Sequence, residues 1–220
     1  MLEPIVIVED HGLIASTVAT ALRGEGIEVR VVRPQPGQDV VGSVLQAEPQ
    51  LVLLDLDLGA AGDATPLVRP LVEAPATVLI VTGVRDPVRR ARCIAEGAAG
   101  VVDKALGFDD LLAAIEAVGQ DGNLLSEPER HAQLELVRRH DRAQREALAP
   151  FEQLTRREAE VLGELMAGHT VDQIAATAVV SVATVRTQVG SIREKLGVNS
   201  QVAAIGLAHE VGWEPPQERM

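Results

Sequence analysis

The first 122 residues alternate between short apolar runs and longer segments with helical spacing, and this alternation limits the possible folds. The apolar runs are IVIV at 5–8, EVRVV at 28–32, LVLL at 51–54, TVLIV at 77–81 and AGVV at 99–102. Short strands that are apolar throughout are typical of a parallel sheet covered by helices on both faces. The sequence therefore predicts a doubly wound (βα)₅ domain of the α/β class over residues 1–122. Its helices are expected at 11–23, 38–47, 64–73, 87–96 and 108–118.

Polar side chains follow four of these runs. Glu9 and Asp10 follow the first run, Asp55 the third, Thr82 the fourth and Lys104 the last. Because the carboxyl ends of parallel strands open onto one crevice, we expect these side chains to meet. Carboxylate oxygens are the ligands that a hard divalent cation prefers, and an ammonium attracts an anion. The pattern predicts a site for a cation and a phosphoryl group.

The last 70 residues have a different pattern, that of a small all-α domain. Four helices are predicted at 155–166, 170–177, 181–196 and 200–210, two of them opened by the capping boxes Thr155-x-x-Glu158 and Thr170-x-x-Gln173. Only residues 178–180 join the second helix to the third, which is the short connection of a helix-turn-helix. The third helix is then expected to enter the major groove of DNA. Its candidate contacts are Thr184, Arg186, Thr187, Gln188 and Ser191, with Arg193 and Lys195 farther along.

Residues 123–150 join these two domains and are strongly charged. Their apolar positions are sparse and the segment ends at Pro150, so we expect a solvated helical linker, with weak self-association as the alternative. The net charge of −12 lies mainly in residues 1–122, which carry 18 acidic and 9 basic side chains. Such a domain is a poor direct ligand for nucleic acid, since duplex binding normally relies on clustered Lys and Arg.

Composition also bears on the compartment. No apolar run is long enough to span a bilayer, and the first residues lack the pattern of a signal peptide, so a cytoplasmic protein without a membrane segment is expected. Cys93 is the only cysteine and is interpreted as a buried helix residue. The five histidines show no metal-ligand spacing with it and are interpreted as structural or exposed.

The two sets of motifs together resemble one family, the bacterial two-component response regulators of the NarL type. VEDHGLIA, LVLLDLDL, VTG and GVVDK resemble the acidic pair, phosphoacceptor strand, switch threonine and lysine segment of a receiver domain. LTRREAEVL, AGHTVDQIA and SVATVRTQVGSIREKLGVNSQVAAI resemble a LuxR-type helix-turn-helix domain over residues 151–220. The resemblance covers both ends of the chain and leaves the linker unmatched.

The resemblance implies roles for individual residues. Asp55 is the expected phosphoacceptor, and Mg²⁺ is expected to bind Glu9, Asp10, Asp55 and the backbone carbonyl of Asp57. Lys104 would pair with the phosphoryl oxygens, and the Thr82 hydroxyl would move to meet one of them. The implied partners are a sensor histidine kinase and promoter DNA, and the implied protein is a transcription regulator rather than an enzyme.

DNA binding is expected to need a homodimer, because one recognition helix carrying three basic side chains neutralises few phosphates. The last helix has apolar and small residues on which two helices could approach closely, and two copies would then read an inverted repeat. The candidate dimerisation residues are Val202, Ala204, Ile205 and Ala208. The alternative for Val202 and Ile205 is that they close the domain's own core.

Several residues depart from the family pattern. Gly59 and Ala105 stand where prolines are frequent, Val101 replaces a common aromatic, and Gln188 and Gly190 replace longer or basic residues of the recognition helix. These departures keep open a regulator that binds DNA without phosphorylation and uses its receiver only to dimerise. A second alternative is a haloacid-dehalogenase-like phosphatase, whose nucleophile motif Asp55-Leu56-Asp57 resembles.

Overall fold

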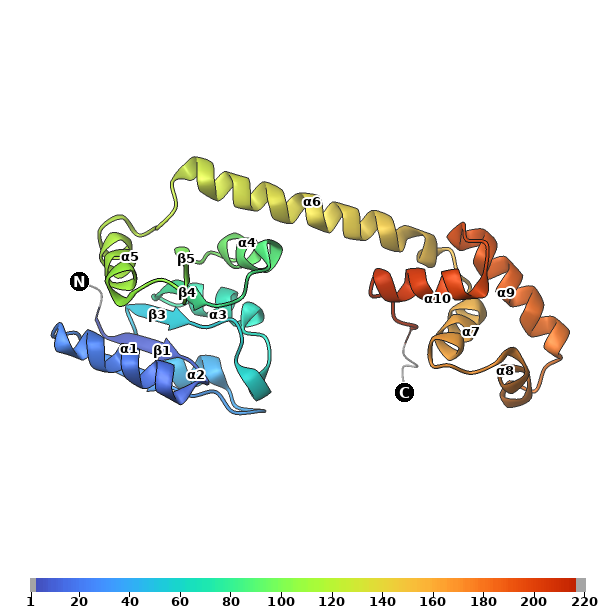
Figure 1. Cartoon of the computed structure of the whole chain (residues 1–220), viewed down its shortest axis with the longest axis horizontal. Coiled ribbons are helices and arrows are strands. Elements are labelled where there is room, and N and C mark those ends of the chain that lie inside the picture. Colours follow the sequence, from blue (N-terminus) through green and yellow to red (C-terminus); the bar gives the residue numbers. More distant parts are fainter. Residues whose placement is uncertain (1–2, 217–220) are drawn as a thin grey trace. The chain divides into compact units, whose positions relative to one another are not determined.

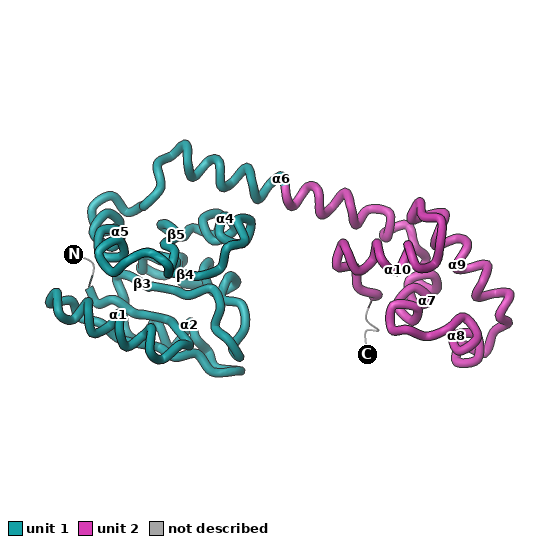
Figure 2. The backbone as a smooth tube through the Cα atoms, in the orientation of Figure 1, with its two compact units in different colours: residues 1–139 teal, residues 140–220 magenta. Residues whose placement is uncertain are grey.

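The structure is a computed structural model that describes residues 3–216, so the outermost residues of both predicted domains lie outside the description. It divides into two compact units, residues 1–139 and 140–220, coloured teal and magenta in Figure 2. Within the described residues, no helix has both the length and the apolar character required to cross a membrane.

A five-stranded parallel sheet with the order β2-β1-β3-β4-β5 forms the centre of the first unit. The strands are β1 (Ile5–Val8), β2 (Val29–Val32), β3 (Leu51–Leu54), β4 (Thr77–Thr82) and β5 (Gly100–Asp103). The prediction of five strands is confirmed, with β4 and β5 each ending one residue later than expected. Ile5 pairs with Val29 on one side and with Leu51 on the other, so β1 is an inner strand with neighbours in both directions.

Helices cover both faces of this sheet (Figure 1). α1 (Gly12–Gly24) and α5 (Phe108–Asp121) pack on the face that receives Ile5 and Ile7. α2 (Val40–Leu45), α3 (Val68–Val72) and α4 (Pro87–Ala95) pack on the opposite face, which receives Val6 and Val8. Successive side chains of a strand point to opposite faces, so the fully apolar strands supply both cores. The doubly wound prediction is confirmed.

The helix expected at 64–73 is shorter than predicted. It begins with a 3₁₀ turn at Thr65–Leu67, which follows another at Gly59–Ala61, and only Val68–Val72 is α-helical. Pro66 and Pro70 explain the difference, because each lacks the N–H that a regular helix needs. In α4, Cys93 is buried as predicted, and burial raises the pKa of its thiol to about 11. Such a thiol is protonated at neutral pH and therefore unreactive.

One long helix, α6 (Glu127–Glu152), lies where a solvated linker ending at Pro150 was expected. The helix continues past Pro150, and the two units divide within it, between residues 139 and 140. Near its start, the Arg130 guanidinium donates to the carbonyls of Ile94 and Ala98 at 3.3 and 3.2 Å. Near its end, Phe151 is part of the second unit's core. Each end of α6 is therefore built into the unit to which it belongs.

The second unit contains four further helices, as predicted. They are α7 (Arg156–Met166), α8 (Val171–Thr177), α9 (Val182–Leu196) and α10 (Gln201–Glu210). Both capping boxes form. The Thr155 and Thr170 hydroxyls accept the backbone N–H groups of Glu158 and Gln173, and the backbone N–H groups of the two threonines donate to the Glu158 carboxylate and the Gln173 amide oxygen. Trp213 stacks on Phe151 with ring centroids 5.3 Å apart, which closes the core near α6.

Candidate functional site

Three carboxylates meet where β1 and β3 end, at the point where the strand order reverses. Glu9 and Asp10 directly follow β1, and Asp55 directly follows β3. Glu9 and Asp55 are buried, only 3% and 4% exposed. Together with His11, each of these residues offers one ligand atom, and the four atoms lie within 4.8 Å of one another. The predicted convergence of Glu9, Asp10 and Asp55 is present, and oxygen donors at this spacing suit a hard divalent cation.

Lys104, which directly follows β5, brings its ammonium to the same place. Its Nζ lies 2.5 Å from Oε2 of Glu9 and 2.7 Å from Oδ2 of Asp55. Burial acts to lower the pKa of Lys104, but hydrogen bonds and charge attraction from Asp55 and Glu9 outweigh it and raise this pKa. The ammonium therefore stays protonated and balances part of the charge of two buried carboxylates.

The second oxygen of Asp55 remains open. Oδ1 is buried and has no hydrogen-bond partner within residues 3–216. A buried charged oxygen without a partner is costly, so the arrangement is complete only when a ligand reaches it. Asp55 also lines a cavity of about 350 Å³ together with Asp57, Thr82 and Lys104. The cavity lies beside this carboxylate and has room for a phosphoryl-sized group.

The remaining predicted residues of this site lie at the same edge of the sheet. Thr82, the last residue of β4, is fully buried, and its hydroxyl accepts the Val84 N–H at 3.2 Å. The Asp57 side chain is exposed and accepts the Gly59 N–H at 3.3 Å. Thr82 and Asp57 thus border the cavity without a direct bond to Asp55.

The glycine that replaces a frequent proline has a structural reason. Gly59 has a φ of +55°, which proline cannot adopt. A Cβ at this position would also collide with Oδ2 of Asp10. Gly59 therefore lets the loop after β3 pass close to a carboxylate of the site, and the departure from the family pattern accompanies a complete set of acids.

Sequence reasoning missed His11 as a member of this cluster. Its Nδ1 lies 2.8 Å from Oδ1 of Asp10 and 3.1 Å from Oε1 of Glu9, although the side chain is 62% exposed as predicted. Charge attraction from Asp10, followed by the hydrogen bond to Glu9, raises the pKa of His11. Its position directly after the acidic pair was the available signal.

In the second unit, α9 exposes only part of the predicted DNA-binding set. Thr184, Arg186 and Thr187 are exposed, while Gln188 and Ser191 are half-buried. Arg193 donates to the Asn199 carbonyl at 2.6 Å, and Lys195 Nζ lies 2.6 Å from Oε2 of the buried Glu158. Arg193 and Lys195 were predicted as DNA contacts, but both groups already hold this unit together. The free cation of the predicted set, among the residues described, is Arg186.

The residues predicted as the dimerisation face of α10 are exposed only in part. Ala204 and Ala208 are buried in the unit's own core, because small side chains four residues apart let α10 pack closely on α7 and α9. Ile205 is half-buried against the same core. Val202 is 77% exposed. Ala204 and Ala208 thus face inward, and Val202 near the start of the helix faces outward.

Comparison with known proteins matches both units. Residues 5–116 match the family model of the response regulator receiver domain, which is more than half of the chain, and residues 152–208 match bacterial regulatory proteins of the luxR family. The chain belongs to the response regulators. It has a receiver domain followed by a LuxR-type DNA-binding domain, the architecture of transcription regulators. The family assignment removes the basis for the dehalogenase-like interpretation of Asp55 and Asp57.

Two curated relatives match this chain over nearly their whole length. The chain is 26% identical to the transcriptional regulatory protein DegU of Brevibacillus brevis, covering 95% of this chain and 94% of DegU. It is 28% identical to the response regulator GacA of Pseudomonas aeruginosa, covering 93% and 94%. Among solved structures, an RcsB–DNA complex aligns with a TM-score of 0.48 and 21% identity, over 94% of this chain and 98% of that one.

Proposed function

We propose that Asp55 accepts a phosphoryl group from a sensor histidine kinase and that this controls dimerisation and promoter binding. The observation that carries the proposal is the asymmetric environment of the Asp55 carboxylate. Oδ2 is held by Lys104, whereas Oδ1 is buried and unpartnered among the described residues, and Asp55 is one of the residues that line the cavity. One oxygen is positioned and the other is available as a nucleophile.

In the proposed transfer, Oδ1 of Asp55 forms a bond to phosphorus while the bond from phosphorus to the donor's histidine nitrogen breaks, and the nitrogen keeps that electron pair. The product is an acyl phosphate. Lys104, already 2.7 Å from Asp55, then has phosphoryl oxygens within reach to which it can donate. The buried Thr82 hydroxyl is the proposed switch group. To bond a phosphoryl oxygen, it would give up the hydrogen bond that it accepts from the Val84 N–H.

The acidic cluster fits Mg²⁺, with Glu9, Asp10, Asp55 and the backbone carbonyl of Asp57 as proposed ligands. Two or three carboxylates beside an open cavity suit a cation that keeps several waters and binds phosphate oxygens. When bound, Mg²⁺ neutralises charge on the transferred group. Glu9 and Asp10 supply the negative charge that holds it next to the nucleophile.

For the LuxR-type domain we propose that α9 reads DNA with Thr184, Arg186 and Thr187. With Arg193 and Lys195 engaged inside the domain, a monomer brings few cations to the phosphates, so two copies on an inverted repeat are needed. The exposed face of α10 that contains Val202 is the proposed contact between the copies. No catalytic turnover is part of this proposal.

Intact-mass measurement after incubation with a small phosphodonor and Mg²⁺ tests the receiver chemistry. We expect one added phosphoryl group in the parent protein and none in Asp55→Asn or without Mg²⁺. Asp63→Asn is the matched control, because Asp63 is paired with Arg89 and lies outside the acidic cluster. An unchanged parent mass, with a second regulator labelled in parallel, would instead favour a regulator that works without phosphorylation.

A further inference from the structure

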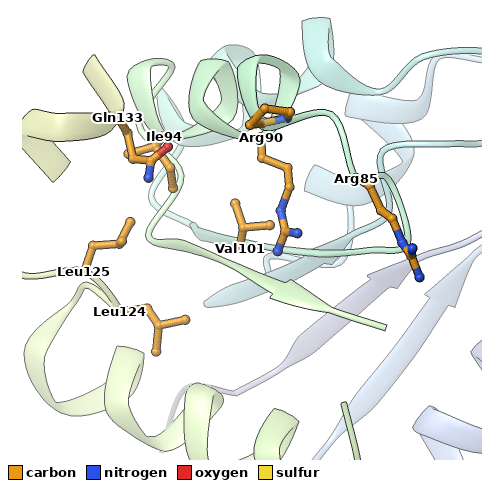
Figure 3. A pocket seen from close by; sticks show the side chains of 8 residues that line it. Arg85, Arg90, Ile94, Val101, Leu124, Leu125 and Gln133 are labelled. Carbon is orange, nitrogen blue, oxygen red and sulfur yellow. The ribbon is translucent and has the colours of Figure 1, made fainter. Parts of the chain in front are cut away.

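A second cavity lies in the first unit, between α4, β5, the segment that joins α5 to α6, and the first part of α6, which contributes Gln133 (Figure 3). Its volume is about 300 Å³, at the lower end of the range for small-molecule sites. In the view of Figure 3, Leu124 and Leu125 lie at one end, Arg85 lies at the other, and the Arg90 side chain extends from α4 toward Val101. The cavity is distinct from the one that contains Asp55, because no residue lines both.

The apolar wall of this cavity is firmly positioned. Leu124 donates its N–H to the Ala99 carbonyl at 2.8 Å and packs so closely over Gly100 that a Cβ there would collide with it. Arg130 ties the same segment down through Asn123 and the carbonyls of α4 and of the turn after it. Ile94 is buried at the base. A ligand would therefore enter a preformed space rather than order a loop, which lowers the cost of binding.

The space exists because the residue on β5 is small. Val101 is half-buried and lines the cavity with a side chain much smaller than an aromatic ring. A ring at this position would occupy volume that is open here. The apolar lining is thus available to an outside group of similar size.

Two cations line the same cavity without strong neutralising partners. Arg85 forms no ion pair within the described part of the chain, and the closest carboxylate to Arg90 is Asp103 at 3.5 Å, the limit for a hydrogen bond. Arg89 on the same helix differs, since its guanidinium is held by Asp63 and the Leu56 carbonyl. Guanidinium groups bind carboxylates in a planar, often bidentate way.

We propose that this cavity binds a small organic acid, one carboxylate attached to a compact aromatic or branched aliphatic group. The carboxylate would bind Arg85 and Arg90, and the apolar group would contact Val101, Leu124 and Leu125. Neither polar ligands nor neutral apolar ligands match both halves of the lining. Through this site, a small molecule would regulate the receiver independently of the phosphoacceptor.

The cavity is connected to the phosphoacceptor site through one short loop. Gly83 and Val84 line the cavity of Asp55, and Arg85, the next residue, lines the second cavity. If phosphorylation moves Thr82, as the proposed function requires, it displaces Arg85 as well. Thermodynamic linkage makes this effect reciprocal. If phosphorylation changes the affinity of the cavity for the acid by some factor, the bound acid changes the equilibrium of phosphorylation by the same factor.

The test is calorimetric titration of the full chain with 3-phenylpropionate and 4-methylpentanoate. We expect saturable binding of one molecule per chain, and about tenfold weaker binding of the neutral amide 3-phenylpropanamide, since a charge-assisted hydrogen bond is lost. Arg90→Gln should weaken binding of the acids by about tenfold for the same reason. Val101→Phe should abolish binding by filling the cavity while leaving the far-ultraviolet circular dichroism spectrum unchanged.

Two controls separate this proposal from the proposed function. Arg30→Gln removes an exposed arginine from β2, at the opposite edge of the sheet from β5, and should bind like the parent. Asp55→Asn takes no phosphoryl group, so phosphodonor treatment should leave its affinity for the acids unchanged. Absence of saturable binding by both acids, or undiminished binding in Val101→Phe, would overturn the site. Equal affinity before and after phosphodonor treatment would overturn the coupling.

Discussion

At the scale of single residues, Gly59 shows how a departure from the family pattern supports the site. Its positive φ disfavours any other residue, and a Cβ there would require the Asp10 carboxylate to shift. Gly59→Ala should raise the energy of the folded loop by about 1–2 kcal/mol and displace Asp10, so phosphorylation by a small donor should need more Mg²⁺. Gly37→Ala is the control, since it also has a positive φ but open space around it. Equal Mg²⁺ dependence in the two variants would remove the role given to Gly59.

Lys104 is the second residue whose removal gives a distinctive result. It balances Glu9 and Asp55, and leaving buried carboxylates unpaired costs about 3 kcal/mol. Lys104→Ala should therefore lower the calorimetric unfolding temperature of the receiver, and added Mg²⁺ should restore more stability to the variant than to the parent. The variant should still accept a phosphoryl group but fail to increase DNA binding.

Lys195→Ala provides the comparison for Lys104→Ala. It removes an ammonium from another buried glutamate, Glu158, in the other unit. It should destabilise its own domain with no response to Mg²⁺. A Mg²⁺ effect of the same size in both lysine variants would argue against the cation site.

At the scale of elements, the Glu158–Lys195 pair joins the start of α7 to the end of α9. Burial acts to raise the pKa of Glu158, but the Lys195 ammonium and the Thr155 backbone and hydroxyl outweigh it and hold this pKa below its ordinary value of 4.5. A carboxyl whose pKa is lower in the folded state stabilises the fold above pH 4.5 and loses this contribution as the pH falls through the lowered value. The LuxR-type domain should therefore weaken in acid.

Trp213, the one tryptophan of the chain, reports on this domain by fluorescence. In urea unfolding followed at Trp213, the parent should lose stability as the pH falls below 4.5. Glu158→Gln should be less stable at neutral pH, and its stability should depend less on pH in the acid range. Glu194→Gln, an exposed glutamate of α9, should follow the parent. Parallel pH profiles for the parent and Glu158→Gln would show that the pair does not control acid stability.

The sequence predicted the positions of helices and strands better than it predicted which side of each helix is buried. Strand ends placed Glu9, Asp55, Thr82 and Lys104 at one edge because a parallel sheet leaves them no other place. No local signal could place Lys195 against Glu158, since the two are 37 positions apart. The local sequence also could not show that Ala204 faces the core, because α10 has apolar and small residues on all sides. Contacts between distant segments decide such questions.

At the scale of the whole molecule, regulation depends on whether two copies assemble. Val202→Glu places a charge on the exposed face of α10 without entering the core, so it should leave folding intact and reduce cooperative binding to an inverted repeat. Arg186→Ala should weaken specific binding by about 1–3 kcal/mol if it contacts a base edge, without changing the number of protein chains per DNA. Sedimentation with labelled DNA measures both quantities. Undiminished two-to-one complexes with Val202→Glu would exclude this face.

Both lysines of the chain, one in each unit, are bonded to a buried glutamate, and arginine is the residue at every other Lys or Arg position. Reagents that acylate side-chain amines consequently have two targets, at the phosphoacceptor and at the junction of α7 and α9. The extent of labelling at each lysine would follow how often its glutamate pair opens. Two peptide masses could then report, in one sample, the opening of the receiver and of the DNA-binding domain separately.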